Sequence, residues 1–218
     1  MGKEIFKRIK EYFYMLLKGL LDVIYPRESF CILCRKNETD YVICNSCKKK
    51  IKKCSKDDIA YGYYKGQLKT IILKFKFERD FNAGDVLVQF LAEKIDTNKY
   101  SNFYITYIPI TKENYRKRGF NQCRYIALEV ARLNNIEVIE CLKLVKKIKI
   151  QKELSKEERR ENIKGAFKII NSNLVYKKRI LLIDDVMTTG ATINEGKSVL
   201  IAAGASEVKQ LVLARAEI

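Results

Sequence analysis

The chain has 218 residues, of which 47% are hydrophobic, a share that supports a folded core and excludes a wholly disordered protein. Lysine and arginine total 43 against 26 acids, and the net charge of +17 would attract nucleic acid, anionic lipid or phosphorylated small molecules, unless lysine is only surface filler. Histidine is absent, which excludes histidine acid–base catalysis and mixed Cys/His metal sites.

The first predicted element is an amphipathic helix within residues 1–30. Its apolar residues recur at helical spacing, at positions 5, 6, 9, 13, 16, 17, 20 and 24. Such a helix packs against the rest of the protein or lies at a membrane interface, and both interpretations stay open. Lys18 interrupts the apolar stretch and no small-residue cleavage site follows, so a signal peptide is not expected. No apolar run approaches the ~20 residues of a membrane span, so no transmembrane segment is expected.

Two CxxC pairs come next, Cys31 with Cys34 in CILC and Cys44 with Cys47 in CNSC, with nine residues between the pairs. Four thiolates close a tetrahedral zinc site with no open position, so the predicted zinc is structural. It would order a segment too short to fold alone, and residues 1–55 are expected to form an N-terminal helix and zinc module. A redox-active dithiol or plain buried thiols are the alternatives.

The chain has seven cysteines and no export signal, which indicates a reducing cytosol. Cys54, Cys123 and Cys141 lie outside the two pairs and are expected to be ordinary thiols.

A dense basic run follows the second pair and contains Lys48, Lys49, Lys50, Lys52 and Lys53. Tyr61, Tyr63 and Tyr64 follow in a predicted strand. A basic track beside stacking rings is typical of single-stranded nucleic acid binding without sequence preference. A solvated helix beside the metal is the alternative for the lysines.

From residue 58 onward the pattern alternates between strands and helices. Strands are expected at 58–66, 103–110, 136–145, 178–186 and 207–216, and helices at 67–77, 83–95, 121–133 and 192–204. This order predicts an α/β fold with a parallel, doubly wound sheet and helices on both faces. Ligands bind such sheets beyond the carboxyl ends of the strands.

One strand ends in two carboxylates. In the stretch ILLIDDVMTTGAT, Asp184 and Asp185 end the strand, and small or hydroxyl-bearing residues follow: Thr188, Thr189, Gly190, Ala191 and Thr192. The acids can accept hydrogen bonds from a vicinal diol, while the small loop and the next helix N-terminus suit a phosphate. A diol and a phosphate this close together describe a ribose 5-phosphate. Acids that merely cap the next helix would leave the threonine-glycine loop unexplained.

This stretch resembles the signature with which type I phosphoribosyltransferases bind 5-phosphoribosyl 1-pyrophosphate (PRPP). The blocks YIPITKENYRKRGFNQ at 107–122 and QKELSKEERRENIKGAF at 151–167 are similar to blocks of the ComF (ComFC-like) competence family, which also carries a leading four-cysteine cluster. The resemblance covers nearly the whole chain, with isoleucines at 108 and 110 where the family has valine and leucine. It implies a phosphoribosyltransferase-like domain at 56–218, with a connecting part at 56–100 and a core at 101–218.

The resemblance also implies roles for single residues. The carboxylates of Asp184 and Asp185 would hold the ribose hydroxyls, and 188–192 would cradle the 5-phosphate. Arg116, Arg118 and the backbone at Gly119 would grip the pyrophosphate with Mg²⁺, so that Asp184, Asp185 and Arg118 are the candidate catalytic residues. Arg159 and Arg160 lie in a polar segment that suits a mobile lid. Solvated loop charge is the alternative for all four of these arginines.

The implied function is PRPP binding in natural transformation, with handling of incoming single-stranded DNA in the cytoplasm. A competence helicase is an expected partner, and such partners could bring the protein to the membrane. Whether PRPP is turned over stays open at this point. An active phosphoribosyltransferase of nucleotide metabolism or salvage is the alternative.

Overall fold

The computed structural model describes residues 30–36, 42–146 and 156–217, together with positions 12, 16, 19, 20 and 23. The predicted N-terminal helix and the first five residues of the block at 151–167 therefore lie largely or wholly outside the described residues. The side chains of Arg159 and Arg160 lie outside them as well. In the part that is described, no helix is both long and apolar enough to cross a membrane.

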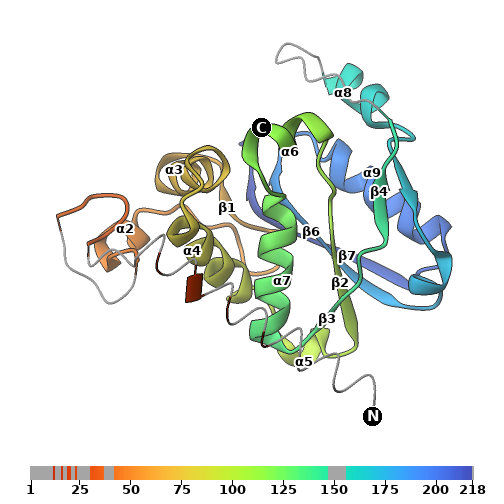
Figure 1. The fold of residues 1–218 in the computed structure, drawn as a ribbon, viewed down its shortest axis with the longest axis horizontal. Helices are drawn as coiled ribbons and strands as arrows, with labels where there is room; N and C mark the ends of the chain where they lie inside the picture. Colours follow the sequence, from red (N-terminus) through yellow and green to blue (C-terminus); the bar gives the residue numbers. More distant parts are fainter. Residues whose placement is uncertain are drawn as a thin grey trace.

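A five-stranded parallel sheet forms the centre of the fold, with the strand order β1-β7-β6-β2-β3 (Figure 1). Its strands are β1 (Ala60–Tyr63), β2 (Phe103–Tyr107), β3 (Glu137–Val138), β6 (Arg179–Met187) and β7 (Glu207–Arg215). The predicted α/β class with a parallel sheet is thus confirmed. The central strand, β6, is the one that carries the two acids.

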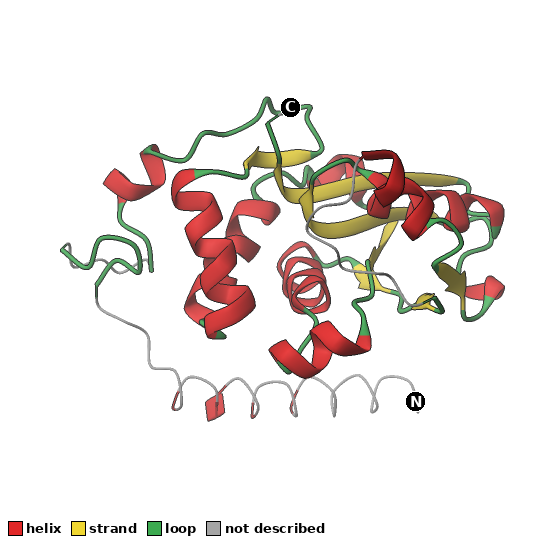
Figure 2. Ribbon diagram, turned by 90° about the horizontal axis from the view of Figure 1, so that it is seen from above, coloured by secondary structure: helices red, strands yellow, loops and turns green. Residues whose placement is uncertain are grey.

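Helices cover both faces of the sheet, as Figure 2 shows from above. On one face lie α4 (Phe81–Ala92) and α7 (Gln122–Asn134), and on the other lies α9 (Ala191–Ala202). The remaining helices are α2 (Asn45–Lys49), α3 (Gly66–Leu73), the π-helix η1 (Lys74–Glu78), α5 (Thr97–Tyr100), α6 (Lys112–Arg118), α8 (Lys156–Ile163) and the 3-10 helix η2 (Ser172–Leu174).

The alternation of side chains along β6 produces a core on each face of the sheet. Leu181 and Ile183 pack into the cluster under α4 and α7, whereas Ile180 and Leu182 pack into the cluster under α9. Helix α9 approaches the sheet closely at Gly196, where an added Cβ would lie 2.8 Å from the Ile108 side chain. Strand β6 is therefore buried on both faces, and only its carboxyl end is open for chemistry.

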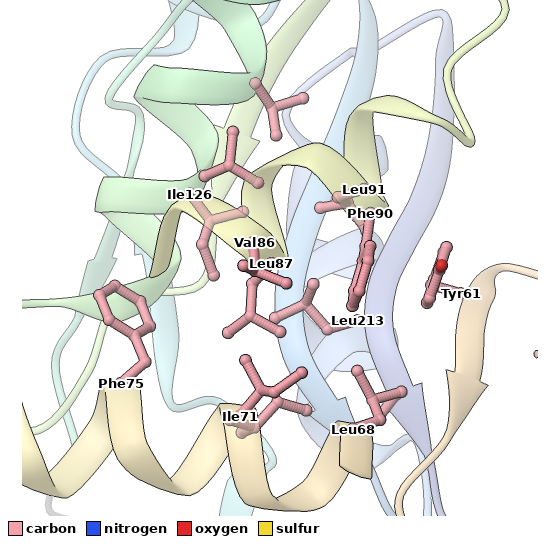
Figure 3. Close-up of a cluster of buried hydrophobic side chains, with 14 of the residues drawn as sticks. Tyr61, Leu68, Ile71, Phe75, Val86, Leu87, Phe90, Leu91, Ile126 and Leu213 are labelled. Carbon is pink, nitrogen blue, oxygen red and sulfur yellow. The ribbon is translucent and has the colours of Figure 1, made fainter. Parts of the chain in front are cut away.

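The segment between residues 58 and 95 packs onto the same core. Figure 3 shows the side chains of α3 and η1 meeting those of α4, with α7 and β7 behind them. The residues labelled there are Tyr61, Leu68, Ile71, Phe75, Val86, Leu87, Phe90, Leu91, Ile126 and Leu213. The expected helix at 67–77 is thus α3 continued by a π-turn, and β1 from this segment pairs with β7.

The prediction of a single strand at 136–145 is wrong. The chain forms β3 and then β4 (Leu142–Leu144), and β4 pairs antiparallel with β5 (Phe167–Ile169) in a separate two-stranded sheet. The apolar residues Ile139, Cys141 and Leu142 are buried in the cluster under α9, so the chain turns away from the edge of the main sheet. An apolar run predicts burial and does not by itself fix the partner strand.

Candidate functional site

The two acids lie at the carboxyl end of the central strand. Asp184 and Asp185 retain only 8% and 7% of their exposure. Two buried, adjacent carboxylates repel each other and lose hydration, so their partners decide which of them keeps its charge.

Asp185 has two strong partners from distant parts of the chain. Its Oδ2 atom accepts a hydrogen bond from the Gln122 amide at 2.6 Å and lies 2.8 Å from the Lys76 ammonium. Gln122 begins α7, and Lys76 lies in η1. Burial by itself would raise the pKa of Asp185, but Lys76 and Gln122 outweigh it and lower that pKa. Asp185 is therefore the ionised member of the pair.

Asp184 has only weak or local partners. Its Oδ1 atom accepts a hydrogen bond from the backbone N–H of Asp185 at 2.9 Å and lies 3.4 Å from the Cys123 thiol, which donates to it. Burial, followed by the charge of Asp185, raises the pKa of Asp184 to about 7. Burial also raises the pKa of Cys123 well above its usual range, so the thiol keeps its proton. The two neighbouring acids thus differ in pKa, which is lowered for Asp185 and raised for Asp184.

Three acceptor atoms in this cluster have no donor among the described residues. They are Oδ2 of Asp184, Oδ1 of Asp185 and Oε1 of the buried Gln122. Of the three, Oε1 of Gln122 is fully buried, and a buried acceptor without a donor costs about 1–3 kcal/mol, so this cluster gains by binding a hydroxyl group. A vicinal diol supplies two such donors.

The loop after β6 has the backbone shape that a phosphate site needs. Gly190 has φ 74°, a left-handed conformation that favours glycine, and it begins α9. Thr188 is exposed, and Oγ1 of Thr189 accepts a long hydrogen bond from the backbone N–H of Ala191 at 3.4 Å. Thr192 lies in the first turn of α9. The residues predicted from the sequence thus adjoin the acids, and the positive end of the α9 dipole points into the loop.

The basic block at 112–118 forms the helix α6 rather than a loop. Its three last residues are basic, and Gly119 ends it at φ 82°. Arg118 lies over the Phe77 ring at 5.3 Å and contributes to the lowered pKa of Asp185, which places it at the acid pair. Arg116 is exposed and forms no ion pair with any residue that the structure describes. Of the two arginines, the structure therefore brings Arg118 to the site.

Sequence reasoning missed the roles of Lys76, Gln122 and Cys123. Gln122 lay within a block that resembles the family, but nothing local assigned its contact. Lys76 follows Ile72 by four positions, on the apolar face of the predicted helix. A lysine on a face that becomes buried needs a carboxylate partner, and this was the signal available in the sequence.

The four cysteines of the N-terminal pairs come together. The Sγ atoms of Cys31, Cys34, Cys44 and Cys47 all lie within 4.8 Å of one another, and those of Cys34 and Cys44 are 3.9 Å apart. Thiolates bound tetrahedrally to zinc at ~2.3 Å are separated by about 3.8 Å, so the cluster fits a tetrahedral metal ion. Burial and hydrogen bonds with the neighbouring thiols raise the pKa of Cys47 to about 12. A cation is therefore needed to keep the thiols ionised together.

The lysine run after the cysteines is partly paired. Helix α2 ends at Lys49, so the run is only half helical. Lys48 and Lys53 lie 2.7 and 3.3 Å from Glu93, and Lys52 lies 3.0 Å from Glu217. The carboxylates neutralise part of the charge that the sequence suggested.

The tyrosines beside this run differ in exposure. Tyr61 does not match the expected stacking role, because it is only 3% exposed and its ring already stacks on Phe90 at 4.6 Å. Tyr63 and Tyr64 are half-buried, and Lys52 and Lys65 lie over the Tyr63 ring. Two of the three rings thus remain at the surface.

The chain is similar to several known proteins. Residues 126–217, which include β6 and the loop after it, match the family model of the phosphoribosyl transferase domain. Competence protein ComFC of Streptococcus pneumoniae is 34% identical over 154 residues, which cover 70% of this chain and 65% of that protein. Competence protein F of Haemophilus influenzae is 28% identical over 215 residues, which cover 87% of this chain and 92% of that protein.

A third relative carries a different name. DNA utilization protein YhgH of Escherichia coli O157:H7 is 27% identical over 158 residues, which cover 70% of this chain and 69% of that protein. The matched part of the chain spans just under two thirds of the pneumococcal protein. The chain is thus similar to competence proteins of the ComFC type, and its carboxyl-terminal part matches the phosphoribosyl transferase domain.

Proposed function

We propose that this chain binds a phosphoribosyl ligand, PRPP or a close relative of it, and takes part in handling incoming single-stranded DNA during natural transformation. The observation that carries the ligand is the pair of open carboxylate oxygens on Asp184 and Asp185, followed directly by the loop at 188–190 and the N-terminus of α9. The names of the relatives, which include competence proteins and a DNA utilization protein, support the biological role.

Each part of the ligand has a matching group at this site. The ribose hydroxyls donate to the open oxygens of the acid pair, and the 5-phosphate accepts from the backbone N–H groups at 189–192 and from threonine hydroxyls. Arg118 is near enough to the acid pair to help lower the pKa of Asp185, and its charge would stabilise a pyrophosphate leaving group. Mg²⁺ would supply further charge neutralisation on the pyrophosphate oxygens themselves.

We further propose that the cysteine cluster holds zinc and that the surface beside it binds single-stranded DNA. Four sulfur ligands favour zinc over hard cations such as Mg²⁺. Lys49 and Lys50 are exposed and have no acid partner among the described residues, and Lys52 and Lys65 lie over the ring of the half-buried Tyr63. Cations and rings on one surface suit a flexible polyanion with bases to stack.

The ligand proposal is tested by calorimetric titration with ribose 5-phosphate and with PRPP. Asp184→Ala removes an acceptor for a ribose hydroxyl, a contribution of about 1.5–3 kcal/mol, so the affinity should fall about 10-fold to 150-fold. Asp57→Ala removes an exposed carboxylate away from the site and serves as the matched control. Equal affinities in the wild type and the Asp184 variant would refute this placement of the ligand.

Pyrophosphate release separates binding from turnover. PRPP, Mg²⁺ and a candidate acceptor, either single-stranded DNA or free bases, are incubated with the protein and pyrophosphate is measured. Release that requires free bases would favour a phosphoribosyltransferase of nucleotide metabolism, whereas release that requires single-stranded DNA, or tight binding without release, supports the role proposed here.

A further inference from the structure

A single lysine from a distant segment lies in the middle of the acid site. Lys76 and Asp185 form an ion pair at 2.8 Å in which the side chains retain only 12% and 10% of their exposure. An isolated buried ion pair gains little stability, because the loss of hydration offsets the attraction between the charges. The pair therefore calls for an explanation other than stability of the fold.

The backbone that carries Lys76 is held firmly. The ring of Phe75, the preceding residue, lies 5.0 Å from that of Phe120 and 5.2 Å from that of Tyr125, which belong to the segment leading into α7 and to α7 itself. On the other side of η1, Asp80 caps α4 by accepting a hydrogen bond from the backbone N–H of Ala83. Lys76 thus reaches Asp185 from a backbone that is anchored at both ends.

The ammonium group lies beside a potential cation site. Ligand atoms of Cys123, Asp184 and Asp185 lie within 4.8 Å of one another, close enough to share one ion. Lys76 already places a positive charge on Asp185, and a divalent ion beside it would be repelled. The protonated Cys123 thiol is also a poor ligand for Mg²⁺, which prefers oxygen. These residues do not fit Mg²⁺ at the acid pair.

We propose that Lys76 is the built-in cation of the acid pair: it holds Asp185 charged and in position where a divalent metal would otherwise be needed. It leaves the other oxygen of Asp185 and one oxygen of Asp184 free to accept the ribose hydroxyls. Lys76 is a positioning residue in this scheme, since it acts through Asp185 and contacts no ribose atom. The inference rests on the proposed function, because it concerns how the same site recognises a ribose phosphate.

The scheme determines how binding depends on metal. Ribose 5-phosphate lacks a pyrophosphate, so any effect of Mg²⁺ on its affinity reports on the protein side of the site. The wild type should bind ribose 5-phosphate equally well with and without millimolar Mg²⁺. In Lys76→Met the uncompensated carboxylates should weaken binding about tenfold or more without metal, and added Mg²⁺ should restore part of the affinity.

The experiment has two arms, both in magnesium-free buffer without chelator so that metal bound to the cysteines is retained. The first is calorimetric titration with ribose 5-phosphate, repeated with added Mg²⁺. The second is direct Mn²⁺ binding measured by electron paramagnetic resonance, which needs no sugar ligand. Lys74→Met is the control, since Lys74 lies on the same helix and contacts Glu78 at 3.1 Å and Asp80 at 3.9 Å rather than the acids of the site.

Lys76→Gln provides a second variant that keeps a hydrogen-bond donor for Asp185 but removes the charge, in case the methionine variant does not fold. A gain of Mn²⁺ binding in either folded Lys76 variant, but not in Lys74→Met, supports the inference. Wild-type affinity and no gain of metal binding in the Lys76 variants would overturn it, as would a wild type that itself requires Mg²⁺ for ribose 5-phosphate. A wild type that binds no ribose 5-phosphate contradicts the proposed function instead, and the Mn²⁺ arm still decides the role of Lys76.

Discussion

The cysteine cluster and the acid pair are both compact groups of buried, ionisable side chains, but they are assembled in different ways. The four cysteines lie within 17 residues of sequence, the first pair at a turn and the second pair at the start of α2, and their sulfur atoms come together. The acid pair draws its partners from η1 and from the start of α7, which are over 60 residues away from it in sequence. The cysteine cluster consists of residues that are close together in sequence, whereas the acid pair meets its partners only when the chain is folded.

The two groups also differ in what they leave unsatisfied. The cysteine cluster has one set of equivalent ligands, and a single metal ion would satisfy all of them. The acid pair keeps one charged carboxylate, one carboxylate with a pKa raised to about 7 and three acceptors without donors among the described residues. A group of the first kind stabilises the fold, whereas a group of the second kind reduces stability in a way that a ligand reverses.

The largest effect is expected from removing the metal site. Cys44→Ser should abolish metal binding and expose the segment around α2 to proteases, because metal binding to such clusters contributes on the order of 10 kcal/mol. Elemental analysis should find about one zinc per wild-type chain and none in the variant. Cys54→Ser is the control, as Cys54 lies outside the cluster. A wild-type protein that is metal-free and resists proteolysis would contradict the prediction that the cysteine cluster stabilises the fold by binding a metal ion.

A smaller and opposite effect is expected at the acid pair. The folded state keeps the proton of Asp184 up to a pKa of about 7, while the unfolded chain loses it near its ordinary value. The free energy of unfolding therefore falls as the pH rises from 4 to 7, by as much as about 1.4 kcal/mol per pH unit, because Asp184 ionises more readily in the unfolded chain than in the folded state. Asp184→Asn removes this loss, so the variant should be more stable than the wild type by a margin that widens from pH 5 to pH 7.

Urea unfolding at pH 5, 6, 7 and 8 measures this margin. Asp57→Asn, at an exposed position, should show no widening. A constant difference between Asp184→Asn and the wild type across this range would mean that Asp184 is already ionised at pH 5, and the contrast in acidity between the two acids would be lost.

The lysine-rich surface next to the cysteines is expected to bind single-stranded DNA independently of the acid pair. Glutamine at positions 48, 49, 50, 52 and 53 should weaken binding of single-stranded DNA and flatten its salt dependence by up to about 3.5 units of slope. The double variant Lys49→Gln/Lys50→Gln should account for about 1.4 units of slope, and the other three lysines, which are paired with Glu93 or Glu217, should add at most about 2.1 units.

Filter binding at several salt concentrations gives the slopes. Lys168→Gln/Lys197→Gln, on β5 and α9, removes two exposed lysines far from α2 and is the matched control (Figure 1). Binding of ribose 5-phosphate should stay unchanged in all these variants. An unchanged slope in the five-site variant would move the DNA surface to α6, near Arg116 and Arg118.

The sequence by itself determined the features that depend on neighbours along the chain. The spacing of Cys31, Cys34, Cys44 and Cys47 predicted their cluster, and the run from 178 to 186 predicted a buried strand ending in two acids. The division into a module at 1–55 and a domain at 56–218 stays a prediction. These inferences are possible because turn geometry and side-chain alternation act over a few residues.

Only the tertiary structure decided the rest. It broke the expected strand at 136–145 into β3 and β4, and it paired Lys48 and Lys53 with Glu93. It also brought Lys76 to Asp185 across more than 100 residues of sequence. Contacts of this kind depend on how helices dock against the sheet, and no local pattern specifies which buried lysine meets which carboxylate, because their charges become coupled only after burial has removed the water between them.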